Sequence, residues 1–281
     1  MSYLFLRFPD FKRKAVSLSY DDCVEADKKM IDVMTANGLK GTFNVNSGLF
    51  GCAGKHLTAE QVAELYLPSG NEINVHGFKH STLSELEEPL IVNEIFSDRK
   101  NLEQLTGRVI KGMAYPNKAR EMEKISLILK HCGIAYARIT GATGKFDLPQ
   151  DWLQMQATCS DFSENLMELA KKFVETSEPD YYWDRMPQWF LMYGHARFTY
   201  EYGNVEKFTK FCEYIGKRED IWYATVGEVY RYAQAYDRLE FSADGTLVYN
   251  PSAIDVYLDY YETQYIIPAG KTVKIKIKDI P

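Results

Sequence analysis

Two adjacent carboxylates, Asp21 and Asp22, end the apolar run SLSY near the beginning of the chain. A single Asp could serve there as the N-cap of a following helix, because its side chain accepts backbone N–H bonds and meets the positive end of the helix dipole. Two neighbouring carboxylates repel each other unless a cation lies nearby. The pair therefore favours a division of labour in which one carboxylate binds a metal ion and the other handles a proton.

Two histidines four residues apart, His76 and His80, offer nitrogen ligands for such a metal ion. On a helical turn this spacing puts both imidazoles on one side, and a carboxylate from Asp21 or Asp22 would complete a three-ligand site that leaves room for water. The HxxxH spacing alone is a weak signal, because it arises by chance. Gly77 excludes a zincin protease, which needs Glu at that position. The same ligand types fit an iron oxygenase, so ligand chemistry alone leaves that class open.

The segments that must position these residues alternate between β-rich and amphipathic runs up to about residue 237. This alternation predicts an α/β fold with a parallel sheet, either a closed (β/α) barrel or an open doubly wound sheet. Asp22, His76, Asn117 and His195 follow four different predicted strands. Since the carboxyl ends of parallel strands share one crevice, we expect these residues to meet. The predicted strands span residues 15–20, 41–46, 72–76, 111–116, 135–140, 189–194 and 221–225.

Local signals predict where several helices begin and end. Thr58, Thr82 and Thr225 are each followed three residues later by Gln or Glu, which predicts three capping boxes. Asn37-Gly38 and Cys132-Gly133 predict helix ends. Neither GxGxxG after the first strand nor GxxxxGK[ST] occurs, so the sequence does not support the common nucleotide-binding folds.

The character of the sequence changes after residue 240. The run FSADGTLVYN contains an Asp-Gly hairpin signal, and the Tyr-rich runs that follow alternate like strands. We therefore expect a catalytic barrel domain over residues 1–240 and a small β-rich extension over residues 241–281. The tyrosines are typical of ordinary sheet, and contact with a sugar is a weaker alternative.

Composition excludes several classes of partner. The net charge of -6, with no dense Lys/Arg run, argues against nucleic acid or an anionic membrane as the main partner. Five scattered cysteines without a CxxC pair favour reduced thiols. The start of the chain lacks a secretory signal and no window approaches a membrane span, so we expect a cytoplasmic protein.

Taken in order, SYDD, HGFKH, AYPN and LMYGH resemble the motifs of the polysaccharide deacetylases, the carbohydrate esterases of family four with a nodulation-protein-B homology domain, over roughly residues 12–237. The resemblance implies a distorted (β/α) barrel of about seven strands and metal-dependent removal of acetyl groups from N-acetylated sugars. It implies that Asp21 is the general base and His195 the general acid. The implied metal ligands are Asp22, His76 and His80, and zinc is the first choice of metal, with nickel, cobalt or manganese as alternatives.

The third motif departs from the family pattern, because AYPN stands where the family has RxPY. Ala114 thus replaces an Arg that neighbours the general base, and we expect Arg138, on the next predicted strand, to place its guanidinium beside Asp21 instead. The resemblance implies that the backbone N–H of Asn117 helps to hold the oxyanion. The residues expected beside the substrate are Tyr115, Pro116 and Asn117.

Two further residues follow from a looser match of KFDLPQDW to the family segment DxxDW. We expect Asp147 to orient His195 and Trp152 to form a wall for the acetyl methyl group.

These observations together predict a metal-dependent deacetylase acting on an N-acetylated oligo- or polysaccharide. A related C–N hydrolase acting on a small cyclic amide or another non-sugar substrate is an alternative that the altered third motif favours. A catalytically inactive carbohydrate-binding protein on the same fold is another alternative. It is disfavoured because the base, the three ligands and the acid are all present.

Overall fold

The main sheet of this computed structural model contains nine strands, and all its pairs are parallel, as the alternation of β and α segments predicts. The structure describes residues 4–52, 56–118, 120–177, 179, 185–260 and 263–276. The strands are β2 (Lys14–Asp21), β3 (Gly41–Val45), β4 (Glu72–Val75), β5 (Gly112–Ala114), β6 (Tyr136–Ala142), β7 (Met155–Ala157), β8 (Cys159–Ser160), β9 (Gln188–Gly194) and β10 (Ile221–Tyr223).

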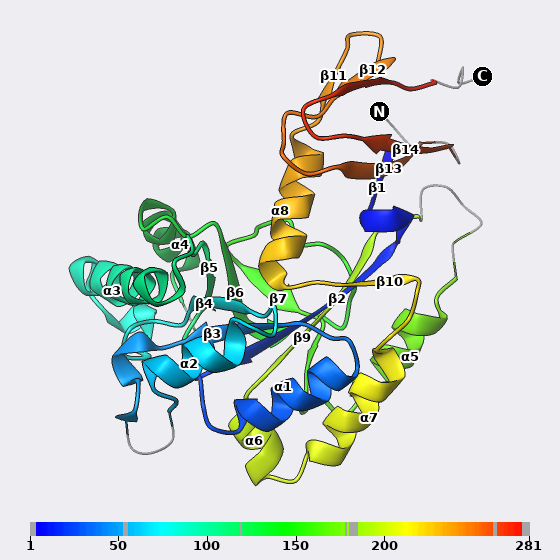
Figure 1. Ribbon diagram of the computed structural model, residues 1–281. Coiled ribbons are helices and arrows are strands. Elements are labelled where there is room, and N and C mark those ends of the chain that lie inside the picture. The colour runs from blue at the N-terminus through cyan, green and yellow to red at the C-terminus, as the bar shows by residue number, and fades with distance from the viewer. Residues whose placement is uncertain are drawn as a thin grey trace.

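The short strands β7 and β8 connect the two sides of this sheet, whose order is β7-β6-β5-β4-β3-β2-β9-β8. β7 pairs with β6 and β8 pairs with β9, and only Thr158 separates the two. The sheet is therefore curled, and the predicted α/β class with a barrel-like parallel sheet is confirmed (Figure 1). The sequence analysis missed β7 and β8, because each is at most three residues long.

The helices cover the outside of the curled sheet (Figure 1). They are α1 (Asp27–Ala36), α2 (Ala59–Tyr66), α3 (Glu88–Thr106), α4 (Met122–His131), α5 (Leu166–Glu175), α6 (Ala196–Glu201), α7 (Val205–Ile215) and α8 (Val226–Asp237). Single 3-10 turns occupy Pro9–Phe11, Ser47–Leu49 and Leu83–Glu85. None of the described helices is long and apolar enough to cross a membrane.

Two of the three predicted capping boxes are confirmed. Thr58 caps α2 and Thr225 caps α8. The prediction at Thr82 is wrong, because only a 3-10 turn follows it and its hydroxyl accepts a hydrogen bond from the Asn117 amide at 3.1 Å. The predicted ends of α1 and α4 are confirmed by the left-handed conformations of Gly38 and Gly133, at φ 71° and 78°.

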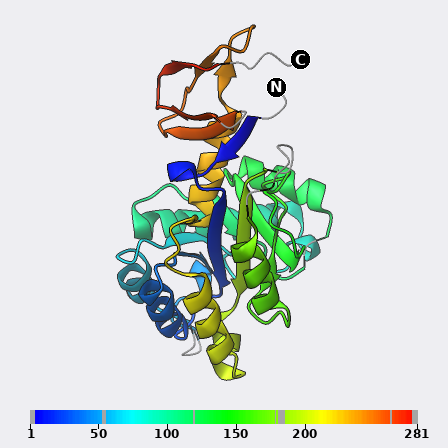
Figure 2. The ribbon, with the colours of Figure 1, turned by 90° about the vertical axis from the view of Figure 1, so that its right-hand side faces the viewer.

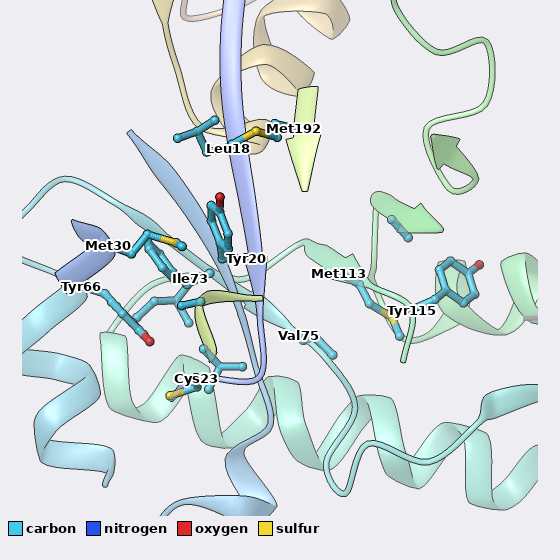
Figure 3. Close-up of a cluster of buried hydrophobic side chains, with 14 of the residues drawn as sticks. Leu18, Tyr20, Cys23, Met30, Tyr66, Ile73, Val75, Met113, Tyr115 and Met192 are labelled. Carbon is cyan, nitrogen blue, oxygen red and sulfur yellow. The ribbon is translucent and has the colours of Figure 1, made fainter. Parts of the chain in front are cut away.

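The largest buried cluster packs the helices against the sheet (Figure 3). Leu18 and Tyr20 of β2 and Val75 of β4 belong to it and are buried. Tyr66 of α2 stacks on Phe43 of β3, with ring centroids 4.4 Å apart and an interplanar angle of 9°. Such pairs stabilise by about 0.5–1.5 kcal/mol beyond their area burial. This packing fixes the strands whose ends carry the polar residues.

The C-terminal extension consists of two small antiparallel sheets carried by α8 (Figure 2). One contains β11 (Glu240–Phe241), β12 (Leu247–Tyr249) and β15 (Thr272–Lys274), and the predicted Asp244-Gly245 turn joins β11 to β12. The other contains β13 (Val256–Tyr260), β14 (Thr263–Ile267) and the N-terminal strand β1 (Leu4–Arg7). The domain boundary at residue 240 stays a prediction. The N-terminal strand β1, which we assigned to the barrel domain, pairs with β13 of the extension. The extension lies at the end of the barrel where the strands begin (Figure 1). Its tyrosines therefore do not line the other end of the barrel, where the strands finish.

Candidate active site

Asp22, His76 and His80 come together where β2 and β4 end. One ligand atom from each residue lies within 4.8 Å of the other two. The Nε2 atoms of His76 and His80 lie 3.6 and 3.5 Å from Oδ1 of Asp22. These separations exceed those of ordinary hydrogen bonds and are compatible with ligand atoms around a shared cation.

His76 is held so that one ring nitrogen faces this cluster. Its Nδ1 lies 2.8 Å from the carbonyl oxygen of Ala114. This contact fixes the ring and leaves Nε2 as the atom that can bind a metal ion. That Nε2 is buried and has no hydrogen-bond partner among the described residues. Burial lowers the pKa of His76, which favours the neutral imidazole that a metal requires. A bound cation would satisfy this otherwise costly atom.

The loops around the cluster adopt unusual backbone conformations. Asp22, Cys23 and His80 have positive φ values of 81°, 55° and 60°. Non-glycine residues in this region cost on the order of 1–3 kcal/mol each and gather at functional sites. Gly77 has φ 82°, and a Cβ there would lie 3.3 Å from a carboxylate oxygen of Glu94. Glycine suits this position because it reaches that φ without strain.

Arg138 holds the Asp21 carboxylate from inside the barrel. Its Nη2 lies 2.6 Å from both carboxylate oxygens, and both side chains are buried. The Nδ2 of Asn44 donates to Oδ1 of Asp21 at 2.8 Å. Burial alone would raise the pKa of Asp21, but the charges of Arg138, His76 and His195 hold it well below its usual range. Asp21 is thus a fixed, ionised group beside the candidate metal ligands.

The sequence register explains why Arg138 can replace the missing family Arg. Arg138 on β6 is the direct cross-strand partner of Ala114 on β5. In a parallel pair, partners side by side project their side chains to the same face. The guanidinium therefore comes from position 138, the neighbour of position 114 on the next strand. Its place beside Asp21 agrees with the expectation from the sequence.

His195 lies between the two carboxylates and the solvent. Its Nε2 is 3.8 Å from an oxygen of Asp21 and 3.8 Å from an oxygen of Asp22. The side chain is 29% exposed, so a ligand can reach it.

Asp161, which was not predicted from the sequence, lies beside Gly194, the residue directly before His195. It is fully buried directly after β8, and the hydroxyl of Thr199 donates to its Oδ2 at 2.7 Å. Burial raises the pKa of Asp161 to about 6, while Thr199 and the charge of His195 act in the opposite direction. A Cβ on Gly194 would lie 2.3 Å from this carboxylate, so glycine is required for the close approach. The sequence signal for Asp161 is its place directly after the run MQATCS. The two short strands in that run, β7 and β8, were not predicted.

The prediction that Asp147 orients His195 is wrong. The preceding residue, Phe146, accepts a hydrogen bond from the backbone N–H of Trp189 at the beginning of β9. His195 follows the end of that strand, and six residues of strand span about 20 Å.

The predicted role of Trp152 is also wrong. Its ring packs against Trp189 and Tyr230, with centroid distances of 5.9 and 5.2 Å, in an apolar cluster. Trp189 lies near the beginning of β9, at the end of the barrel opposite to the candidate site. Trp152 therefore cannot form a wall for an acetyl group there.

The AYPN stretch lies partly in the core. The side chain of Tyr115 is buried in the largest cluster, so its ring is not available to a substrate, contrary to our expectation. Pro116 is buried and lies beside Gly77. Asn117 is exposed in a left-handed conformation at φ 60°, and its proposed contact with an oxyanion stays a prediction.

An exposed aromatic strip formed by Phe162, Phe198 and Tyr202 extends from His195. The ring of Phe198 lies 5.0 Å from that of His195. The Phe162 and Tyr202 rings lie 6.4 and 5.7 Å from Phe198. The three side chains are 41%, 38% and 68% exposed. Contiguous exposed apolar surface of this kind commonly marks a binding site.

Solved structures with TM-scores above 0.5 support the fold. A protein of Mycobacterium smegmatis described as a polysaccharide deacetylase has a TM-score of 0.58 and 16% identity, over 83% of this chain and 94% of that one. The peptidoglycan N-acetylglucosamine deacetylase Bc1960 has a TM-score of 0.52 and 15% identity, over 80% and 90%. With the Streptococcus pyogenes deacetylase PplD, at 20% identity and a TM-score of 0.42, the match covers 44% of this chain and 55% of that one.

Comparison at the sequence level agrees with the resemblance. No curated protein matches the chain. The family model described as polysaccharide deacetylase matches residues 9–137, which include the acidic pair, both candidate histidine ligands and the AYPN stretch. Residues 9–137 of this chain are therefore similar to the polysaccharide deacetylase family.

Proposed function

We propose that the protein is a metal-dependent deacetylase that removes acetyl groups from N-acetylated sugars. One observation carries this proposal: the Nε2 atoms of His76, His80 and His195 all lie 3.5–4.0 Å from carboxylate oxygens of Asp21 or Asp22. The match of residues 9–137 to the polysaccharide deacetylase model supports the reaction type.

Asp22, His76 and His80 would hold the divalent cation. The unpartnered, buried Nε2 of His76 supports this assignment. Zinc is the first choice, and nickel, cobalt and manganese are alternatives, since Asp and His ligands discriminate weakly between them. When bound, such a cation supplies a Lewis acid that polarises the amide carbonyl and acidifies water.

Asp21 would take the proton from the attacking water. Arg138 and Asn44 hold its carboxylate in one orientation, with Oδ2 toward His76 and His195. A base fixed in this way loses no orientational freedom when the reaction begins.

His195 would protonate the leaving amine. Its exposed ring can reach a bound substrate. The backbone N–H of Asn117 would stabilise the oxyanion.

The substrate class follows from the surface beside His195. The strip of Phe162, Phe198 and Tyr202 offers flat apolar faces that suit the apolar faces of sugar rings. The related Bc1960 is a peptidoglycan N-acetylglucosamine deacetylase, which supports N-acetylated sugars as the substrates to try first.

The direct test is acetate release from N-acetylchitooligosaccharides and peptidoglycan fragments by zinc-loaded protein. We expect Asp21→Asn to lower the rate by at least about 100-fold, while Asp32→Asn, on the exposed side of α1, leaves it unchanged. Equal acetate release by Asp21→Asn would remove Asp21 from the base role.

Metal analysis and alternative substrates separate the remaining functions. We expect one divalent cation per chain, lost in Asp22→Asn and His80→Ala. A protein that takes up no divalent metal would point to a carbohydrate-binding role. A metal-loaded protein that hydrolyses small cyclic amides but releases no acetate would point to the other C–N hydrolase class.

A further inference from the structure

A cavity of about 680 Å³ lies at the end of the barrel opposite to the candidate active site. Residues just before β5 and at the beginning of β4 form one wall, α8 forms another, and the loop between β12 and β13 contributes Ser252 and Ile254. The cavity therefore lies where the barrel meets the extension, which Figure 2 shows carried on α8. Its volume falls within the usual range of small-molecule sites.

Four basic side chains line this cavity: Arg108, Lys111, Arg231 and Arg238. Within the described part of the chain, none of them has an acidic partner within 4.0 Å. The whole chain carries a net charge of -6, so these cations create a local positive field on an acidic protein.

The two acidic side chains in the wall have polar partners outside this group of cations. Glu228 forms an ion pair with Lys40, with Nζ 2.9 Å from Oε1. Glu72 accepts hydrogen bonds from the hydroxyl of Thr42, at 2.8 Å, and from that of Tyr136. Burial raises the pKa of Glu72, while these hydrogen bonds and the charge of Arg231 act in the opposite direction.

An aromatic surface lies beside the basic residues. The rings of Tyr136 and Tyr230 both line the cavity, and their centroids are 4.7 Å apart. Arg231 and Gln234, on the same helix as Tyr230, line it as well. Charge and a flat ring surface are thus presented together.

We propose that this cavity binds a small molecule in which a phosphate or diphosphate group is attached to a ring, as in a sugar phosphate or a nucleotide. Guanidinium groups match phosphate oxygens with two parallel hydrogen bonds, and the partly exposed ring of Tyr230 would pack against the ring of the ligand. A ligand with a single carboxylate group would need fewer positive charges than the four that line the cavity. The number of cations therefore favours a phosphorylated ligand. This inference does not depend on the proposed deacetylase function.

Calorimetric titration with three phosphorylated probes tests the proposal: inorganic pyrophosphate, N-acetylglucosamine 1-phosphate and uridine diphosphate. We expect wild-type protein to bind at least one probe, and Arg231→Gln/Arg238→Gln to weaken binding by at least about tenfold, or about 1.4 kcal/mol. Lys171→Gln/Lys271→Gln removes the same charge from exposed positions outside the cavity and should bind like wild type. Preference for the sugar phosphate or for the nucleotide identifies the source of the phosphate.

Asp22→Asn distinguishes this cavity from the candidate metal site, because phosphate bound through a metal would be lost in that variant. Retained affinity in Asp22→Asn supports the cavity. The proposal is overturned if no probe binds at millimolar concentration, if Asp22→Asn abolishes binding, or if Arg231→Gln/Arg238→Gln folds and binds unchanged. Should that double variant unfold, Arg108→Gln/Lys111→Gln gives the same test from the opposite wall.

Discussion

The guanidinium of Arg138 bonds both carboxylate oxygens of Asp21 at 2.6 Å, although their strands, β6 and β2, are not paired with each other. The contact crosses the inside of the curled sheet. Because Arg138 is the cross-strand partner of Ala114, the cation reaches the same carboxylate from the strand next to the one that the family motif predicts.

Replacement of Arg138 tests this relationship. We expect Arg138→Ala to lower kcat by about 100-fold, since it releases the base, and to destabilise the fold by about 3–5 kcal/mol, since it leaves a buried carboxylate unpaired. Acetate release and urea unfolding measure the two effects. Adding Ala114→Arg to Arg138→Ala should restore part of the activity. A double variant that folds but is no more active than Arg138→Ala would show that the two positions are not interchangeable.

A second prediction concerns Asp161. We expect Asp161→Asn to lower kcat by about tenfold with little change in KM, because the buried carboxylate lies against the backbone at Gly194, next to His195, and does not contact the substrate. Asp147→Asn makes the same chemical change at the residue that the sequence suggested, and it should leave kcat unchanged. The opposite result for the two variants would return the orienting role to Asp147.

The aromatic strip predicts a change in substrate binding. Phe198→Ala should raise KM for oligosaccharides by about two- to tenfold, which corresponds to the loss of one aromatic contact, and leave kcat nearly unchanged. The control is Phe96→Ala, which removes a similarly exposed ring from α3. Equal KM values for Phe198→Ala and wild type would exclude the strip as a sugar platform.

The stability of the fold should depend on pH through Asp27 at the start of α1. Its carboxylate is buried and accepts hydrogen bonds from Tyr66 at 2.6 Å and from the N–H of Val24 at 2.8 Å. Burial raises the pKa of Asp27 to about 7, while these two bonds act against the rise. The unfolded value is about 3.9, so the folded state binds more protons between about pH 4 and 7. The free energy of unfolding therefore falls as pH rises through this window.

Asp27→Asn removes this titration. We expect its unfolding free energy to vary less with pH and to exceed that of the wild type above pH 7, by no more than about 4 kcal/mol. Urea unfolding between pH 5 and 8 measures this, with Asp32→Asn as a control on the exposed side of α1. A variant with the same pH dependence as the wild type would contradict the assignment to Asp27.

Much of the site was predictable because its signals are local. Asp22, His76 and His195 each come after a strand that short-range sequence patterns reveal, and parallel strands deliver such residues to one edge. The spacing of His76 and His80 is also a local property of one loop. The sequence alone therefore determined the α/β class and the edge at which these residues gather.

Only the tertiary structure decided which distant side chains support them. The contact between Arg138 and Asp21 depends on how far the sheet curls, and Asp161 lies against Gly194, directly before His195, because two very short strands bring it there. Trp152 was misplaced because a sequence match does not state at which end of a strand a loop lies. Local patterns determine where strands end, whereas register and curvature arise from the packing of the whole chain and decide which of those ends meet.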